Sequence, residues 1–144
     1  MADAVVVVAE SGRGRYQQDV QVGQHRLVAD EPVSMGGGGS GPAPFDFLLT
    51  ALGACTSMTL RMYAERKGLA LRRVSVELQH AKVDVDGSQR DRIERRITLE
   101  GDLMPAERQR LLEIAEKCPV HRTLSQPLLI ESRLEPALDT PSKP

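Results

Sequence analysis

The sequence predicts a single α+β domain that combines antiparallel strands with two helical segments. Three observations indicate this class. Short apolar strands separated by turn residues occupy residues 1–30, an almost unbroken apolar run begins at Pro44, and an alternating hairpin spans residues 71–100. The chain has 144 residues, which suits one domain over residues 1–144, and it shows no internal repeat.

The composition argues against several classes of function. Nineteen basic residues are balanced by 20 acidic ones, which disfavours a nucleic-acid partner. Trp is absent and only two Phe and two Tyr are present, so platforms for stacked bases are lacking. The apolar run over residues 44–60 contains Asp46 and four hydroxyl residues, and it falls short of a clean membrane span. We therefore expect a cytoplasmic protein whose cysteines are kept reduced, without nucleic-acid or membrane partners.

The N-terminal third predicts strands followed by a loop. Residues 1–30 are typical of a three-stranded meander, with turn signals at residues 11–14 and at Gly23. Residues 31–43 form a Gly-rich segment whose glycines lack the spacings of phosphate-binding loops. We interpret this segment as a mobile lid or connector.

A long central helix is predicted over residues 44–67. Pro44 suits the first helical position and Gly68 suits the stop. One inward stripe is expected to include Cys55 and Met58, and the opposite face stays apolar until Arg61. A helix that is apolar nearly all round needs cover on several sides, so the pattern favours a homodimer with a shared core.

A β-hairpin is predicted over residues 71–100, where apolar and polar residues alternate on both sides of an Asp-Gly turn. The alternation slips after Leu78, which indicates a β-bulge.

The C-terminal third predicts a helix and a closing strand. The second helical segment covers residues 105–124, and it should break at Cys118 because Pro119 follows. A last strand is predicted over residues 128–134, and residues 135–144 form a Pro-rich tail that we expect to fray.

The two cysteines are the candidate reactive groups. Cys55 lies in apolar helical surroundings, where burial alone would raise its pKa, so a reactive Cys55 needs a cationic partner. Arg13, Arg15 and Arg26 in the N-terminal strands are candidates for that cation. Cys118 stands before a new helical turn, whose free N–H groups favour the thiolate.

The residues alone leave several interpretations open. The thiols are either a reacting pair that the fold brings together or inert core cysteines, since free cysteine is often a small buried hydrophobe. A zinc site at Cys55, Cys118 and His121 with His25 or His80 lacks the paired spacing of such sites. A serine hydrolase would need a nucleophile elbow, which the sequence lacks.

Three segments resemble the OsmC/Ohr family of thiol-dependent hydroperoxide reductases. They read GPAPFDFLLTALGACTSMTLRMYAERKG, RIERRITLEGDL and LLEIAEKCPVHRTL, and the LGACT and CPVHRTL motifs each contain one cysteine. The resemblance covers roughly residues 10–134. It implies an OsmC-like fold and an intertwined homodimer, in which antiparallel β-sheets from both chains wrap around two long central helices.

The resemblance also implies an activity. Cys55 would be the peroxidatic thiolate that reduces an organic hydroperoxide to an alcohol and becomes a sulfenic acid. Cys118 would be the resolving thiol that forms a disulfide with Cys55, and an external dithiol would reduce it without any metal or organic cofactor. Arg13 or Arg15 would lower the pKa of Cys55 and orient the peroxide.

Further site residues follow from the start of the long helix. Where the family has an acid ten positions before the peroxidatic cysteine, this chain has Phe45, and Asp46 is the next residue that could replace the acid. An apolar lining from Phe45, Phe47, Met58 and Met62 would favour a hydrophobic peroxide over hydrogen peroxide. The alternative function is that of a non-enzymatic dimeric pocket protein, which binds an apolar small molecule and uses the cysteines only as lining.

Overall fold

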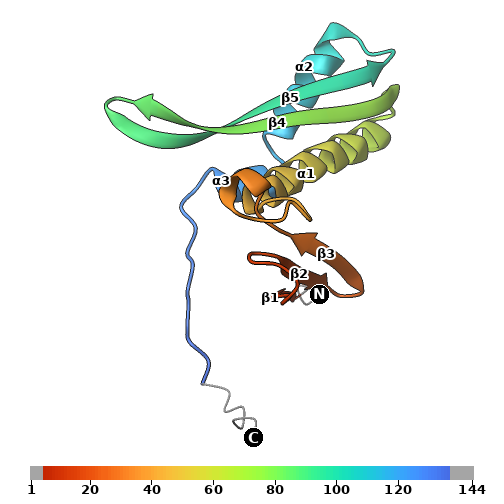
Figure 1. Cartoon of the computed structure of the whole chain (residues 1–144). Helices are drawn as coiled ribbons and strands as arrows, with labels where there is room; N and C mark the ends of the chain where they lie inside the picture. The colour runs from red at the N-terminus through yellow and green to blue at the C-terminus, as the bar shows by residue number, and fades with distance from the viewer. Residues whose placement is uncertain (1–4, 137–144) are drawn as a thin grey trace, which may run out of the picture.

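The computed structural model describes residues 5–136 and confirms the α+β class. A three-stranded antiparallel sheet precedes the long helix, and a two-stranded antiparallel hairpin and two short helices follow it, as Figure 1 shows. The elements are β1 (Val6–Glu10), β2 (Gln18–Val22), β3 (His25–Ala29), the 3-10 turn η1 (Val33–Met35), α1 (Pro44–Lys67), β4 (Leu71–Val85), β5 (Ser88–Gly101), α2 (Pro105–Ala115) and α3 (Pro119–Leu124).

Helix α1 has the predicted bounds because local signals define both ends. Pro44 needs no hydrogen-bond partner at the first helical position, and the Asp46 carboxylate accepts the N–H of Ala43 at 2.9 Å. The helix ends at Gly68, whose φ of 67° lies in the left-handed region that favours glycine. Although α1 has 24 residues, no helix within residues 5–136 is both long and apolar enough to cross a membrane.

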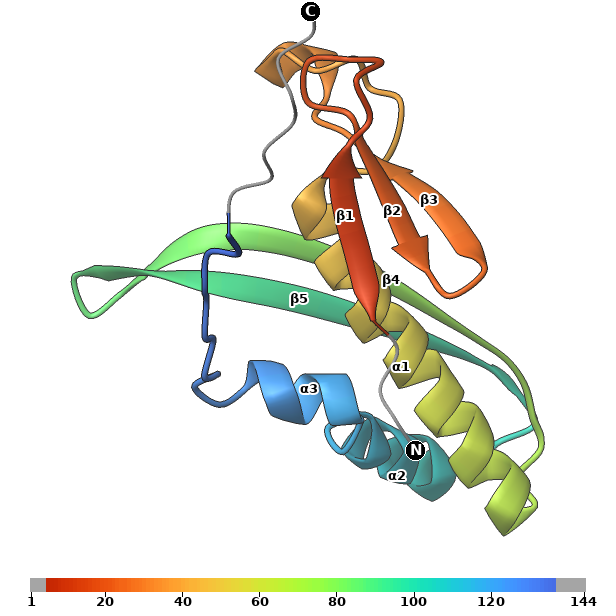
Figure 2. The same ribbon diagram turned by 90° about the horizontal axis from the view of Figure 1, so that it is seen from below.

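The β4–β5 hairpin packs along one side of α1, and α2 lies beside the C-terminal half of α1 (Figure 2). Pairing runs without interruption from Arg73 opposite Glu100 to Val85 opposite Ser88. The predicted bulge after Leu78 is therefore wrong, because the alternation continues with a histidine, His80, at the next inward position. The core between these elements consists of Leu60, Ala64, Leu71, Leu103, Leu111, Ile114 and Ala115.

The Gly-rich segment connects β3 to α1, as one of its two predicted roles requires, and it is hydrogen-bonded to Asp30 at the end of β3. Asp30 is only 3% exposed, and its carboxylate accepts hydrogen bonds from the Ser40 hydroxyl at 2.6 Å and from the N–H groups of Ser40 and Gly38. These hydrogen bonds hold the pKa of Asp30 below its usual value. A Cβ at Gly37 or Gly41 would lie 2.0 or 2.2 Å from a backbone oxygen, so the chain packs there as only glycine allows.

The two ends of the described chain extend from this body. The sheet of β1, β2 and β3 lies on the other side of α1 from the hairpin, and residues 126–136 run outward as an extended segment (Figures 1 and 2). The predicted strand over residues 128–134 is wrong for the isolated chain, because no strand among residues 5–136 lies beside it to complete a ladder. The predicted tail lies beyond the described residues from residue 137 onward.

Candidate active site

The loop between α2 and α3 positions Cys118. Helix α2 ends at Ala115 and Pro119 opens α3, so the predicted helical segment is broken where the proline signal indicated. Cys118 caps α3 with extended backbone (φ −60°, ψ 134°), and its Sγ accepts the N–H of His121 at 3.4 Å. The Cys118 side chain is completely buried. Solvent therefore cannot reach this sulfur directly.

The second thiol, Cys55, lies on the flank of α1 that faces α3. It is partly exposed, and it lies close enough to the Cys118 thiol and to the N–H of Val120 for both groups to shift its pKa. Both cysteines are free thiols. The fold therefore brings two cysteines from distant parts of the chain into direct contact, with one of them accessible and the other enclosed.

The contact shifts the two pKa values in opposite directions. Burial raises the pKa of Cys55, and the bond to Cys118 raises it further. Burial acts in the same sense on Cys118, but the hydrogen bonds from the Cys55 thiol and from the His121 N–H outweigh it, so the pKa of Cys118 lies below its usual value. The two thiols therefore influence each other's ionisation, and the contact favours the thiolate form more at Cys118 than at Cys55.

A buried arginine, Arg95 of β5, connects the elements around the thiols. Its Nη1 donates to Thr56 Oγ1 at 2.9 Å and to the Ala115 carbonyl at 3.4 Å, and its Nη2 donates to His121 Nδ1 at 3.1 Å. The Arg95 side chain is only 11% exposed. Sequence reasoning missed Arg95, although its place between Ile93 and Ile97 in an alternating strand is a signal that it faces inward.

The contact with Arg95 determines which ring nitrogen of neutral His121 carries the hydrogen. A guanidinium can only donate, so Nδ1 of His121 accepts and its proton sits on Nε2. Nε2 lies 2.9 Å from the Glu116 carboxylate and donates to it. Within residues 5–136, no three His, Cys, Asp or Glu side chains are grouped so as to hold a metal ion. Arg95, His121 and Glu116 are held together by hydrogen bonds and ion pairs.

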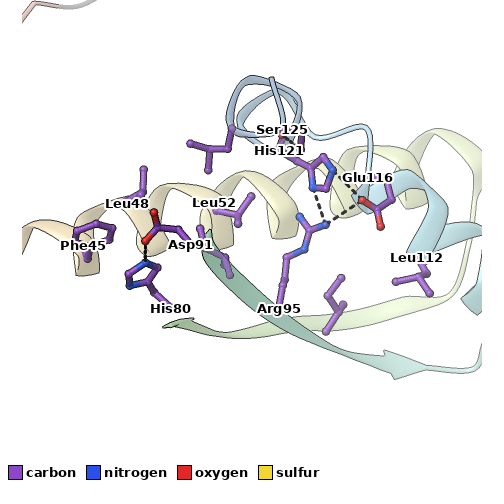
Figure 3. Close-up of a pocket in the computed structure, with 13 residues that line it drawn as sticks. Phe45, Leu48, Leu52, His80, Asp91, Arg95, Leu112, Glu116, His121 and Ser125 are labelled. Carbon is purple, nitrogen blue, oxygen red and sulfur yellow. Dashed lines mark hydrogen bonds and ion pairs between the residues drawn. The ribbon is translucent and has the colours of Figure 1, made fainter. Parts of the chain in front are cut away.

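A cavity of about 560 Å³ adjoins this network and runs along α1 (Figure 3). Arg95 and His121 lie toward one end of it. Toward the other end, His80 Nε2 lies 2.7 Å from the Asp91 carboxylate, and the His80 ring stacks on Phe45 at 4.4 Å. The apolar lining consists of Phe45, Leu48, Leu52, Ile93, Ile97, Leu112 and Leu124. The cavity suits an apolar molecule that carries a small polar group.

The predicted polar residues lie elsewhere within one chain. Arg13 pairs with Asp19 at 2.7 Å, and the Arg15 guanidinium lies over the Tyr16 ring at 4.9 Å. Asp46 caps the start of α1. Among residues 5–136, none of these three predicted site residues forms a hydrogen bond with a cysteine.

The predicted apolar lining is divided between two surfaces. Phe45 lines the cavity, whereas Met58 and Met62 are 60% and 64% exposed and lie on a different face of α1. Phe47 is half-buried and lies outside the cavity lining. Of the predicted substrate-contacting residues, only Phe45 therefore shares the cavity with Arg95 and His121, and it lies toward the opposite end.

The fold and site together define a class: an α+β protein in which a cysteine on a long helix contacts a second cysteine at the cap of a later helix. The family model described as OsmC-like protein matches residues 37–133. The chain belongs to the OsmC-like protein family, in agreement with the resemblance of its motifs.

Three solved structures share this fold. The OsmC like protein from Mycoplasma pneumoniae is 20% identical with a TM-score of 0.68, and the match covers 87% of both chains. An organic hydroperoxide resistance protein OsmC from Legionella pneumophila is 18% identical with a TM-score of 0.67, over 86% of this chain and 90% of that one. An organic hydroperoxide resistance protein from Elizabethkingia anophelis is 18% identical with a TM-score of 0.63, over 85% and 87%. No curated protein matches the chain.

Proposed function

We propose that the protein is a thiol peroxidase that reduces organic hydroperoxides to alcohols in defence against oxidative or osmotic stress. The observation that supports this most directly is the pair of neighbouring free thiols, of which Cys55 is partly exposed and Cys118 is buried. The adjoining apolar cavity suits an organic substrate. Two of the structures with this fold are named organic hydroperoxide resistance proteins, which supports the same substrate class.

The proposed cycle uses the two thiols in turn. The Cys55 thiolate attacks a peroxide oxygen, the O–O bond breaks, and the leaving alkoxide takes a proton to depart as an alcohol. The Cys118 thiolate then attacks the sulfenic acid sulfur of Cys55, and the displaced hydroxide leaves as water once protonated. The lowered pKa of Cys118 suits this second step, because it favours the thiolate that attacks. An external dithiol reduces the disulfide, and the cytoplasm is the compartment where such dithiols are maintained.

The proposed active form is an intertwined homodimer. Exposed apolar side chains gather on three regions that one chain leaves uncovered: the outer face of α1, strand β1 and the extended C-terminal segment. They are Val6, Val7, Val8, Met58, Met62, Leu128, Leu129, Ile130 and Leu134. Arg13 and Arg15 remain candidates to lower the pKa of a Cys55 thiol, and in this proposal they act on the Cys55 of the partner copy.

The alternative function is a non-enzymatic dimer that binds an apolar small molecule. One observation favours it: neither cysteine is among the residues that line the cavity. In that case the thiols are part of the packing around the ligand, and peroxide leaves them unchanged.

Turnover of cumene hydroperoxide with dithiothreitol as reductant distinguishes the two functions. We expect Cys55→Ala to lose peroxide consumption completely. In the absence of dithiothreitol, Cys118→Ala should still react once with the peroxide, and its Cys55 should be trapped as a sulfenic acid. Full turnover by Cys55→Ala, or no consumption by the parent protein, would exclude the peroxidase and leave the pocket protein.

A further inference from the structure

The hydrogen bonds of Arg95 connect every helix around the thiol pair. Thr56 belongs to α1 and directly follows Cys55, the Ala115 carbonyl ends α2, and His121 belongs to α3. Figure 3 shows the Arg95 side chain reaching His121 and Glu116 along the cavity wall. One side chain from the hairpin therefore holds the segments that flank both cysteines.

The segment that carries Cys118 has little other support. Helix α3 has six residues, too few to be stable in isolation. None of its residues is fully buried. Hydrogen bonds from a charged donor are about twice as strong as neutral ones, so the Arg95 contacts are a substantial part of what keeps α3 on α1. The planar guanidinium reaches all three acceptors at once.

We infer that Arg95 is a positioning residue that keeps Cys55 and Cys118 within bonding range and thereby governs disulfide closure rather than the attack on peroxide. The reaction it serves rests on the proposed function. Closure itself does not, because glutathione disulfide also oxidises a thiol pair: two thiols and one glutathione disulfide give one protein disulfide and two glutathione thiols.

A lysine at position 95 distinguishes a role of the positive charge from a role of the hydrogen-bond geometry. A lysine keeps the positive charge but is a point donor on a flexible stem, and it cannot span Thr56, Ala115 and His121 together. If Arg95 acts by position, Arg95→Lys behaves like Arg95→Ala. Arg96→Ala is the matched control, since Arg96 is the next residue, faces the opposite side of the hairpin, and pairs with Glu77 and Glu94.

The test equilibrates the full-length variants in glutathione redox buffers and measures the fraction of protein with the Cys55–Cys118 disulfide. We expect the effective concentration of the thiol pair to fall about tenfold or more in Arg95→Ala and Arg95→Lys, as small misplacements of reacting groups do, and to stay unchanged in Arg96→Ala. Circular dichroism confirms that each variant is folded, and Arg95→Lys decides the outcome if Arg95→Ala does not fold.

A second measurement uses one equivalent of cumene hydroperoxide and traps sulfenic acid with dimedone. We expect Arg95→Lys to form the Cys55 sulfenic acid at the parental rate and to accumulate it. Unchanged effective concentrations in both Arg95 variants, or full rescue by lysine, would overturn the positioning role and leave the proposed function intact. A parent protein that does not react with peroxide would overturn the proposed function, while the glutathione titration would still decide the role of Arg95.

Discussion

The two sides of helix α1 differ in how far a single chain completes them. The side toward the hairpin, α2 and α3 buries Leu52, Thr56, Leu60 and Ala64 and contacts the thiol site. The outer side leaves Met58 and Met62 mostly exposed, and the valines of β1 in the N-terminal sheet are exposed as well. The inner side is a buried core, whereas the outer side is an exposed apolar surface, which is what the proposed dimer would cover.

The difference between the two sides of α1 also explains why its buried residues were predicted only in part. An inward stripe with Cys55 and Met58 was predicted. Cys55 does face α3, but Met58 is exposed, and the buried stripe passes through Leu52, Thr56 and Leu60. When a helix is apolar on every side, its sequence does not indicate which face is buried, because burial is predicted from the contrast between an apolar face and a polar face.

The largest effect is expected in the buried core between α1, the hairpin and α2. Leu60→Ala removes a completely buried side chain, and we expect it to lower the free energy of unfolding by about 2–5 kcal/mol. Urea denaturation at two protein concentrations measures this, and the loss should be the same at both. Met58→Ala on the outer side is the control, and its smaller loss should depend on protein concentration. Equal and concentration-independent losses would remove the distinction between the two sides.

A charge on the outer side should break the proposed dimer. We expect Met58→Glu combined with Met62→Glu to shift the protein from dimer to monomer in sedimentation at micromolar concentration, because two buried unpaired carboxylates oppose association. Thr98→Glu is the control, since Thr98 is exposed on the outward face of β5. A parent protein that sediments as a monomer would contradict the dimer outright.

The loop that joins the two regions should tolerate no side chain at its tight contacts. Gly41→Ala places a Cβ 2.2 Å from the Val28 carbonyl oxygen, and we expect a loss of about 1–3 kcal/mol in the free energy of unfolding. Gly14→Ala is the control, because its Cβ would meet only the Gln17 side chain at 3.3 Å. Equal stability of the two variants would show that the loop is loosely held after all.

The smallest expected effect concerns the pKa values of the thiols. Cys118→Ala should lower the pKa of Cys55, because it removes one of the two influences that raise it, although burial keeps it above its usual value. Cys55→Ala should raise the pKa of Cys118, which loses a hydrogen-bond donor. The pH dependence of alkylation by iodoacetamide reports both pKa values, and shifts in the reverse directions would disprove the mutual influence of the two thiols.

The sequence was most informative where the signal is local. Pro44 and Gly68 defined α1, and Pro119 marked the break at Cys118, because these residues restrict the backbone wherever they occur. The sequence did not identify Arg95, and it suggested His80 only as a possible zinc ligand, although both residues lie at inward positions of their alternating strands. Their roles depend on partners from distant elements.

The remaining differences are tertiary in origin. The hydrogen bonds that Asp30 makes to the Gly-rich segment come from residues whose pairing the sequence does not encode locally. The apolar pattern over residues 128–134 is typical of a strand, but a strand requires a neighbour, and the chain by itself supplies none among residues 5–136. When a segment pairs with a strand of another copy of the chain, the sequence pattern can show that the segment suits a strand, but it cannot show which strand lies beside it.

The most direct test of the two-thiol cycle counts thiols. One equivalent of cumene hydroperoxide is added to the fully reduced protein, free thiols are titrated, and the disulfide is located by peptide mapping. We predict the loss of two thiols per chain and a single disulfide that joins Cys55 to Cys118 within one chain. Two thiols that survive the peroxide, or a disulfide that joins different chains, would contradict the account.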